Sequence, residues 1–228
     1  MAARLGRFIE TFRGSSFPTL AETTDGERVV IKMRGAGNGA GALLSEFLVN
    51  RFAYLCGLPV PDVRIVEIAA DHPWDFGTDE FDDLLQKSAG ANLGICWIPA
   101  ARQVCAEEAA SHPEEFISQV VTLDLTFSNL DRSPASCNLL REQSGHRWII
   151  DHGSCRFLFR RGAVSGALPD DHIFRGRVDA FDGKWLEPLV SALVEETVTE
   201  VPEQWLAEES FSREQILTWI GSALPTQK

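Results

Sequence analysis

The sequence predicts an α+β chain of two lobes, with a small antiparallel-sheet lobe carrying one packed helix ahead of a mainly helical lobe. Three observations support this prediction. Short apolar segments separated by turn residues fill the first third, one segment with helical spacing follows them, and longer helical patterns dominate the second half. With 228 residues, of which 44% are apolar, the chain can bury a substantial core. We expect the lobes to be residues 1–100 and 101–228.

The first strands are expected in three short segments rich in β-forming residues, at 7–12, 19–24 and 29–33. Asp25-Gly26 provides the turn between the second and the third. The first two are joined by Gly14 to Pro18, a loop whose backbone N–H groups are free to face an anion. These segments predict a small antiparallel sheet.

A helix is expected over 42–56, because apolar side chains recur there at helical spacing and Gly57 and Pro59 follow as a stop signal. The preceding segment, 35–41, is rich in glycine. Position 40 is Ala, so it lacks the third glycine of a dinucleotide fingerprint, and we interpret the segment as a flexible linker. Two further strands are expected at 63–68 and 93–98, around a solvated stretch with a short helix at 71–83.

The second lobe is expected to contain a helix over 114–129, which opens with Pro113 and acidic residues that suit a helix N-terminus. A polar loop follows, and then an apolar strand at 147–151. Helical patterns return near 185–199 and 213–224. No internal repeat is visible.

Composition excludes several classes of protein. The net charge of −12 disfavours nucleic acid and anionic membranes as main partners. The longest stretch free of charged residues and His, 88–101, has fourteen residues, fewer than the ~20 needed to span a bilayer. No secretory signal is visible, so we expect a cytoplasmic protein. The five cysteines are an odd number with no CxxC pair, which disfavours a disulfide framework or a zinc site, and their mostly apolar neighbours disfavour a catalytic thiol.

Groups suited to phosphoryl transfer from ATP occur in order along the chain. Lys32 ends a strand, and Glu46 lies among apolar neighbours of the predicted helix, where its carboxylate needs a partner such as Lys32. Asp131 and Asn138 occupy the polar loop, and Asp151 ends the apolar strand. A cation for the phosphates, an acid that orients it, a carboxylate near the attacking hydroxyl and oxygen ligands for Mg²⁺ are the groups this reaction requires.

These motifs resemble the HipA-like kinase family. The resemblance rests on Asn129-Leu130-Asp131-Arg132, on an asparagine before Leu139-Leu140, and on a strand that ends in Asp151-His152-Gly153. In that family these elements replace the HRD, Asn and DFG elements of ordinary protein kinases. The resemblance covers Arg7 to about Phe157 well and the rest loosely. It implies a protein-kinase-like fold and an ATP- and Mg²⁺-dependent serine/threonine protein kinase.

The resemblance also assigns roles to single residues. Lys32 would hold the α- and β-phosphates and pair with Glu46. Asp131 would accept or orient the proton of the substrate hydroxyl. Asp151 would bind the metal ion that bridges the β- and γ-phosphates. His152 stands where DFG has Phe, so we interpret it as a packing or hydrogen-bonding residue.

One departure from the kinase pattern concerns the second metal ligand. The kinase asparagine falls five residues after the catalytic aspartate, where this chain has Ser136. Asn138 falls seven residues after it but stands directly before the apolar pair, so we favour Asn138 as the ligand and keep Ser136 as a weaker candidate. This departure leaves open a nucleotide-binding pseudokinase that serves as an interaction module. A kinase acting on a lipid head group or small molecule is also open, because the family resembles phosphoinositide kinases.

Further nucleotide contacts are expected at both ends of the first sheet. Gly14, Ser15 and Ser16 would face ATP with backbone N–H groups, and the resemblance suggests that one of the serines can be phosphorylated. Trp97 and Ile98 either line the adenine pocket or belong to the core.

A protein with a Ser or Thr acceptor is the expected partner, and the resemblance leaves a separate antitoxin or regulatory protein open. Arginines after residue 151 either hold an acidic or phosphorylated segment or are simply solvated: Arg156, Arg160, Arg161, Arg175 and Arg177.

Overall fold

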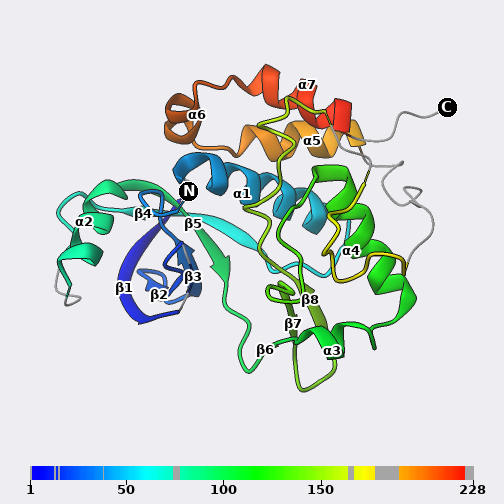
Figure 1. The fold of residues 1–228 in the computed structure, drawn as a ribbon. Helices are drawn as coiled ribbons and strands as arrows, with labels where there is room; N and C mark the ends of the chain where they lie inside the picture. The colour runs from blue at the N-terminus through cyan, green and yellow to red at the C-terminus, as the bar shows by residue number, and fades with distance from the viewer. Residues whose placement is uncertain are drawn as a thin grey trace.

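The computed structural model describes residues 2–12, 14, 16–37, 39–73, 78–163, 167–177 and 190–223. A barrel of strands lies at one side of the molecule, and helices fill the other side (Figure 1). The long helix α1, Gly39–Leu55, runs between the two. The arrangement is the mixed α and β architecture that the sequence predicts.

Five strands close into a barrel in the order β1-β2-β3-β5-β4. Their bounds are β1 Ala3–Thr11, β2 Thr19–Thr23, β3 Arg28–Lys32, β4 Val63–Ile68 and β5 Gly90–Cys96. Four of the contacts between strands are antiparallel, but β1 and β4 pair in parallel through Ala3↔Val66 and Arg4↔Glu67. The prediction of a plain antiparallel sheet is therefore corrected, because this closing contact joins segments too distant in sequence for a local pattern to reveal.

The barrel has an apolar filling that continues under helix α2, Asp79–Lys87. Ile31 and Val66 are fully buried, and Phe81 of α2 packs on the same cluster. Thr78 caps α2, accepting a hydrogen bond from the backbone of Phe81 at 3.2 Å. The short helix expected at 71–83 is thus present but lies further along the chain.

Helix α1 begins inside the glycine-rich segment that the sequence analysis interpreted as a linker, which corrects that interpretation for Gly39 to Gly41. A Cβ on Gly41 would lie 2.8 Å from the Phe159 ring and 2.9 Å from the Glu209 carboxylate. The glycine is needed because these two side chains pack directly against the helix backbone. Helix α1 is buried on nearly all sides and contacts the C-terminal helices α5 and α6.

The second half contains more strand than predicted. A three-stranded sheet has the order β6-β7-β8, with β6 at Arg102–Gln103, β7 at Leu139–Arg141 and β8 at Arg147–Ile149. Only β8 was expected. The helices are α3 Ala106–Ala109, α4 Glu114–Phe127, α5 Val190–Thr199, α6 Glu203–Glu209 and α7 Arg213–Ala223. Residues 185–189 of the helix expected at 185–199 lie outside the described residues.

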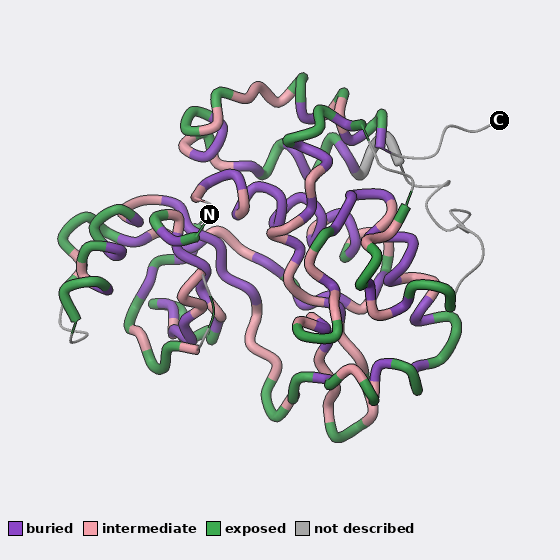
Figure 2. Tube along the Cα trace, in the orientation of Figure 1, coloured by how far each residue is buried: buried purple, intermediate pink, exposed green. Residues whose placement is uncertain are grey.

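The main apolar core spans the expected boundary at residue 100. It joins Leu44 of α1 and Leu93 of β5 to Val120 of α4, Trp205 of α6 and Ile220 of α7. Figure 2 shows that most of α1 and the second half of α4 are buried. The division into lobes at residue 100 stays a prediction. No helix among the described residues is long and apolar enough to cross a membrane.

Trp205 gives a test of this core. Its indole is fully buried, stands edge-on to Phe47 at 6.1 Å between ring centroids, and donates a hydrogen bond to the Ala91 carbonyl at 2.9 Å. We expect Trp205→Ala to lower the free energy of unfolding by about 3–5 kcal/mol in urea denaturation, because it leaves a large cavity between α6, α1 and β5. The control is Trp219→Ala, since Trp219 is only half-buried. An equal loss in both variants would contradict the prediction.

Candidate active site

Lys32 joins three separate segments through two ion pairs. Its Nζ lies 2.9 Å from Oε2 of Glu46 in α1 and 2.8 Å from Oδ1 of Asp151, which follows β8. Lys32 and Glu46 are buried, whereas the Asp151 side chain is 41% exposed. The strand register fixes the lysine, because Lys32 pairs with Leu93 of β5 at the end of β3. The three residues that the sequence assigned to phosphate, orienting acid and metal are therefore in direct contact.

The charges in this cluster shift one another's ionisation. Burial by itself lowers the pKa of Lys32, but Glu46 and Asp151 outweigh it and raise that pKa. Burial raises the pKa of Glu46 against the opposing effect of Lys32. Burial also acts to raise the pKa of Asp151, but the ammonium of Lys32 outweighs burial and lowers that pKa. Lys32 is held as a cation, and Asp151 as a carboxylate that still reaches solvent.

The Asp151-His152-Gly153 segment is folded onto Glu46. The backbone N–H of His152 donates to the Glu46 carboxylate. A Cβ on Gly153 would lie only 3.3 Å from Glu46 Oε2. His152 is fully buried, and neither ring nitrogen has a hydrogen-bond partner among the described residues. Asp151 itself has φ of +62°, a left-handed backbone that Asp tolerates better than most residues.

Asp131 lies on a loop held by Asn138 and Ser136. The Asn138 amide donates to the Asp131 carbonyl at 2.5 Å, and its oxygen accepts a hydrogen bond from the Ser136 hydroxyl at 3.0 Å. Asp131 is half-buried, and burial followed by the charge of Asp151 raises its pKa. The two aspartates thus repel each other, although the Lys32 charge reduces that repulsion at Asp131.

A buried network that the sequence analysis missed supports this loop. Arg132 is 1% exposed and donates from Nε to Asp124 of α4 at 2.5 Å. Asp124 also accepts from Asn129 at 2.8 Å and contacts His172 Nε2 at 2.9 Å. Burial acts to raise the pKa of Asp124, but Arg132 and His172 outweigh it and hold that pKa well below its usual range.

The network was not predicted from the sequence. Arg132 pairs with Asp124 of α4 rather than with its neighbour Asp131. His172 shares the same Asp124 carboxylate. The available signal was Asp124 itself, a carboxylate four residues after Val120 and three before Phe127, in the apolar stripe of α4. A charge in that position needs a buried partner.

The other expected nucleotide contacts lie in the Gly14–Pro18 loop and just after β5. Within the Gly14–Pro18 loop, the Phe17 N–H donates to the Gly14 carbonyl at 3.1 Å; Ser16 is described there and Ser15 lies outside the described residues. Trp97 is half-buried and stacks on Phe12 with 6.0 Å between centroids, which places it beside the start of that loop. Ile98 is also half-buried. Among described residues, no hydrogen bond or ion pair joins these positions to Lys32.

The donor set fits a magnesium ion bound together with a nucleotide. Mg²⁺ in such sites takes one or two protein carboxylates and completes its coordination with phosphate oxygens and water. Asp131 and Asp151 carry the repelling charges that a divalent cation relieves, and Asn138 adds an amide oxygen beside them. In the described part of the chain, no group of three or more His, Cys, Asp or Glu forms a metal cage.

Three of the five arginines that follow Asp151 have partners of their own. Arg177 pairs with Glu114 at 2.7 Å, and Arg175 with Asp170 at 2.7 Å. Arg156 lies over the Phe159 ring at 5.6 Å. These contacts partly neutralise the basic segment, so they give little support to a role in holding an acidic peptide.

The model of one family, described as HipA-like kinase, matches residues 8–225. The match includes every residue of the charged cluster and of the buried network. A search of curated proteins found no match.

His152 provides a pH-dependent test. Burial lowers the pKa of His152 to about 3, from about 6.5 when it is exposed. Between pH 3 and pH 6.5 the unfolded chain therefore binds a proton at this residue and the folded chain does not. The stabilising effect of a neutral His152 is therefore complete above pH 6.5 and is lost as the pH falls toward 3. We expect His152→Phe to make the free energy of unfolding less dependent on pH in that window, measured by denaturant titrations at several pH values.

The control is Phe174→Leu, a substitution of a fully buried side chain that does not titrate. It should lower the free energy of unfolding by a similar amount at each pH. The slope of that free energy against pH should stay as in the wild type. A His152→Phe variant with an unchanged slope would show that His152 is not the group that resists protonation.

Proposed function

The chain belongs to the HipA-like kinase family, and on this premise we propose that it is an ATP- and Mg²⁺-dependent phosphotransferase acting on Ser or Thr of a protein. The double ion pair of Lys32 with Glu46 and Asp151 is the observation that supports the proposal most strongly. It joins a strand end, a helix and the segment after β8, which are the elements that hold a nucleotide's phosphates in a kinase.

Each member of the cluster has a distinct task in this proposal. Lys32 offers its charge to the phosphates of ATP, and Glu46 keeps that ammonium in place because its own carboxylate is fully buried. Asp151 and Asn138 would hold Mg²⁺. Bound Mg²⁺ supplies neutralisation of the charge on the phosphoryl oxygens.

Asp131 would receive or orient the proton of the acceptor hydroxyl. Its raised pKa, caused by burial and by Asp151, makes it a better proton acceptor than an ordinary carboxylate. Its loop is fixed from two sides, by the Asn138 amide and by the buried Arg132. A fixed loop favours transfer because the carboxylate does not have to be ordered during the reaction.

A pseudokinase that binds nucleotide without transfer is the second candidate. The observation that favours it is the hydrogen bond from the Ser136 hydroxyl to the Asn138 side-chain oxygen. This hydrogen bond uses one lone pair of the oxygen that would otherwise coordinate a metal ion. A lipid or small-molecule acceptor, and a separate antitoxin or regulatory partner, remain proposals from the family resemblance.

Asp131→Asn tests the transfer step. We expect it to reduce transfer of phosphate from γ-labelled ATP, to itself or to proteins of a lysate, by about a hundredfold or more, because the general base is lost. Nucleotide affinity should change little. The matched control is Asp170→Asn, since that carboxylate is 97% exposed and lies in the ion pair with Arg175.

Three outcomes separate the candidate functions. Transfer absent in wild type, with ATP still bound, would support the pseudokinase. Label found in lipid or small molecules, and lost in Asp131→Asn, would keep the enzyme and change the acceptor. Transfer equal in wild type and Asp131→Asn would contradict the assigned role of Asp131.

Asn138→Ala and Ser136→Ala test the metal site. We expect Asn138→Ala to weaken Mg²⁺-dependent ATP binding by about tenfold or more, since it removes a ligand and releases the Asp131 loop. Ser136→Ala should leave the affinity within about twofold or improve it, because it frees the Asn138 oxygen. Titration calorimetry of ATP with and without Mg²⁺ measures both. A larger loss of Mg²⁺-dependent ATP affinity in Ser136→Ala than in Asn138→Ala would identify Ser136 as the metal ligand.

A further inference from the structure

Three arginines form a row across the three-stranded sheet. Arg102 of β6 is the register partner of Arg141 in β7, and Arg141 is in turn the partner of Arg147 in β8. Residues directly opposite each other on neighbouring strands have side chains on the same face. Like charges in such pairs repel, so this row, the arginine row, opposes folding of the sheet unless anions offset it.

Nearby groups offset only part of this charge. Arg102 is paired with Glu108 of α3 at 2.5–2.6 Å. Arg147 donates from Nε to His112 at 3.0 Å, and burial, then Arg147 and Arg141, lower the pKa of His112 to about 4, so the imidazole adds no charge. Arg141 has no ion-pair partner among the described residues. The row therefore keeps a local positive charge in a chain whose net charge is −12.

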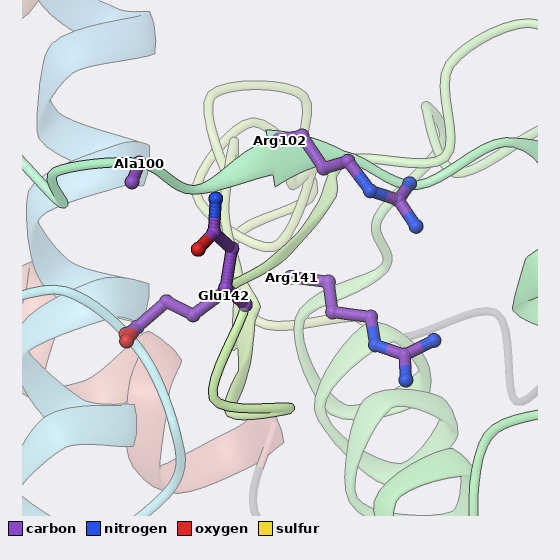
Figure 3. Close-up of a pocket in the computed structure, with 5 residues that line it drawn as sticks. Ala100, Arg102, Arg141 and Glu142 are labelled. Atoms are coloured by element: carbon purple, nitrogen blue, oxygen red, sulfur yellow. The ribbon is translucent and has the colours of Figure 1, made fainter.

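A pocket adjoins the row. It has a volume of about 520 Å³ and is lined by Ala100, Arg102, Arg141, Glu142 and Gln143. Arg102 and Arg141 extend side by side from neighbouring strands, and Glu142 points the opposite way (Figure 3). The Glu142 carboxylate accepts a hydrogen bond from Trp148 Nε1 at 2.7 Å, which holds it away from the two guanidinium groups although it remains part of the pocket wall.

The row lies beside the candidate active site without belonging to it. Arg141 is three residues after Asn138, which along a strand is about 10 Å. Guanidinium groups bind phosphoryl oxygens through paired, charge-assisted hydrogen bonds, and adjacent arginines suit a group with two negative charges. A monocarboxylate would offset less of the charge.

We propose that the arginine row and its pocket bind a dianionic phosphoryl group, at a site separate from the position of the ATP phosphates. The phosphoryl group is carried by a phosphorylated Ser or Thr of a peptide or by a free phosphate compound. The proposal does not depend on phosphate transfer by this chain, because the pocket is lined by Arg102 and Arg141 and by none of Lys32, Asp131 and Asp151.

The test uses the full chain without nucleotide or Mg²⁺. Titration calorimetry with inorganic phosphate, and fluorescence anisotropy with a labelled phosphoserine peptide and its unphosphorylated form, are compared for wild type, Arg141→Gln and Arg4→Gln. We expect Arg141→Gln to weaken binding by about tenfold or more. Arg4→Gln, the same change of charge at an exposed position of β1, should bind as the wild type does. Tighter binding of the phosphopeptide identifies a peptide source, and binding of inorganic phosphate alone identifies a free one.

A second measurement distinguishes a ligand site from a structural role. At low ionic strength without phosphate, Arg141→Gln should raise the melting temperature, because it removes repulsion from both neighbouring arginines. Added phosphate should raise the melting temperature of the wild type and not that of Arg141→Gln. Equal phosphate binding in wild type and Arg141→Gln would overturn the proposal, and so would a lower melting temperature of Arg141→Gln that phosphate does not influence.

Discussion

The buried ammonium of Lys32 is the constraint on which the candidate site depends. Removing a charge from water is costly, and burial is tolerated only where partners of opposite charge are close and well placed. Glu46 and Asp151 meet that requirement at 2.9 and 2.8 Å. Because the three residues come from β3, α1 and the segment after β8, the ion pairs hold the barrel, the central helix and the small sheet in one relative position. Loss of either carboxylate would leave the buried ammonium with one ion-pair partner instead of two.

A second buried charge, Arg132, orders the loop that carries Asp131. Its partner Asp124 fixes the guanidinium to α4, and the same guanidinium donates to the Asn138 carbonyl at 2.7 Å. That carbonyl also accepts from the Ile150 N–H at 3.1 Å, one residue before Asp151. Asn138 therefore connects the two aspartates through its backbone, whatever its side chain does toward a metal ion. The left-handed backbone at Asn138 and Asp151 is maintained by these contacts around both residues.

The small sheet β6-β7-β8 connects the candidate active site to the arginine row. One end of β7 and β8 adjoins Asn138 and Asp151, and Leu139 and Ile149 there are buried in the core. The other end presents Arg141 and Arg147. The apolar end anchors the sheet, so the repulsion between the arginines is tolerated where the strands leave the core. The main core also unites α1 with α5 to α7, so the C-terminal helices support the helix that carries Glu46.

The sequence by itself determined the strands of the hairpins, the helix bearing Glu46 and the order of Lys32, Glu46, Asp131 and Asp151, because turn residues, periodicity and motifs are local. It also indicated that Glu46 needs a partner, since an acid among apolar neighbours cannot remain unpaired. Only the tertiary structure decided the parallel closure of the barrel, the pairing of Arg132 with Asp124 rather than Asp131, and the alignment of three arginines from separate strands. Each of these depends on contacts between residues distant in the chain, and a local pattern carries no information about which segments meet.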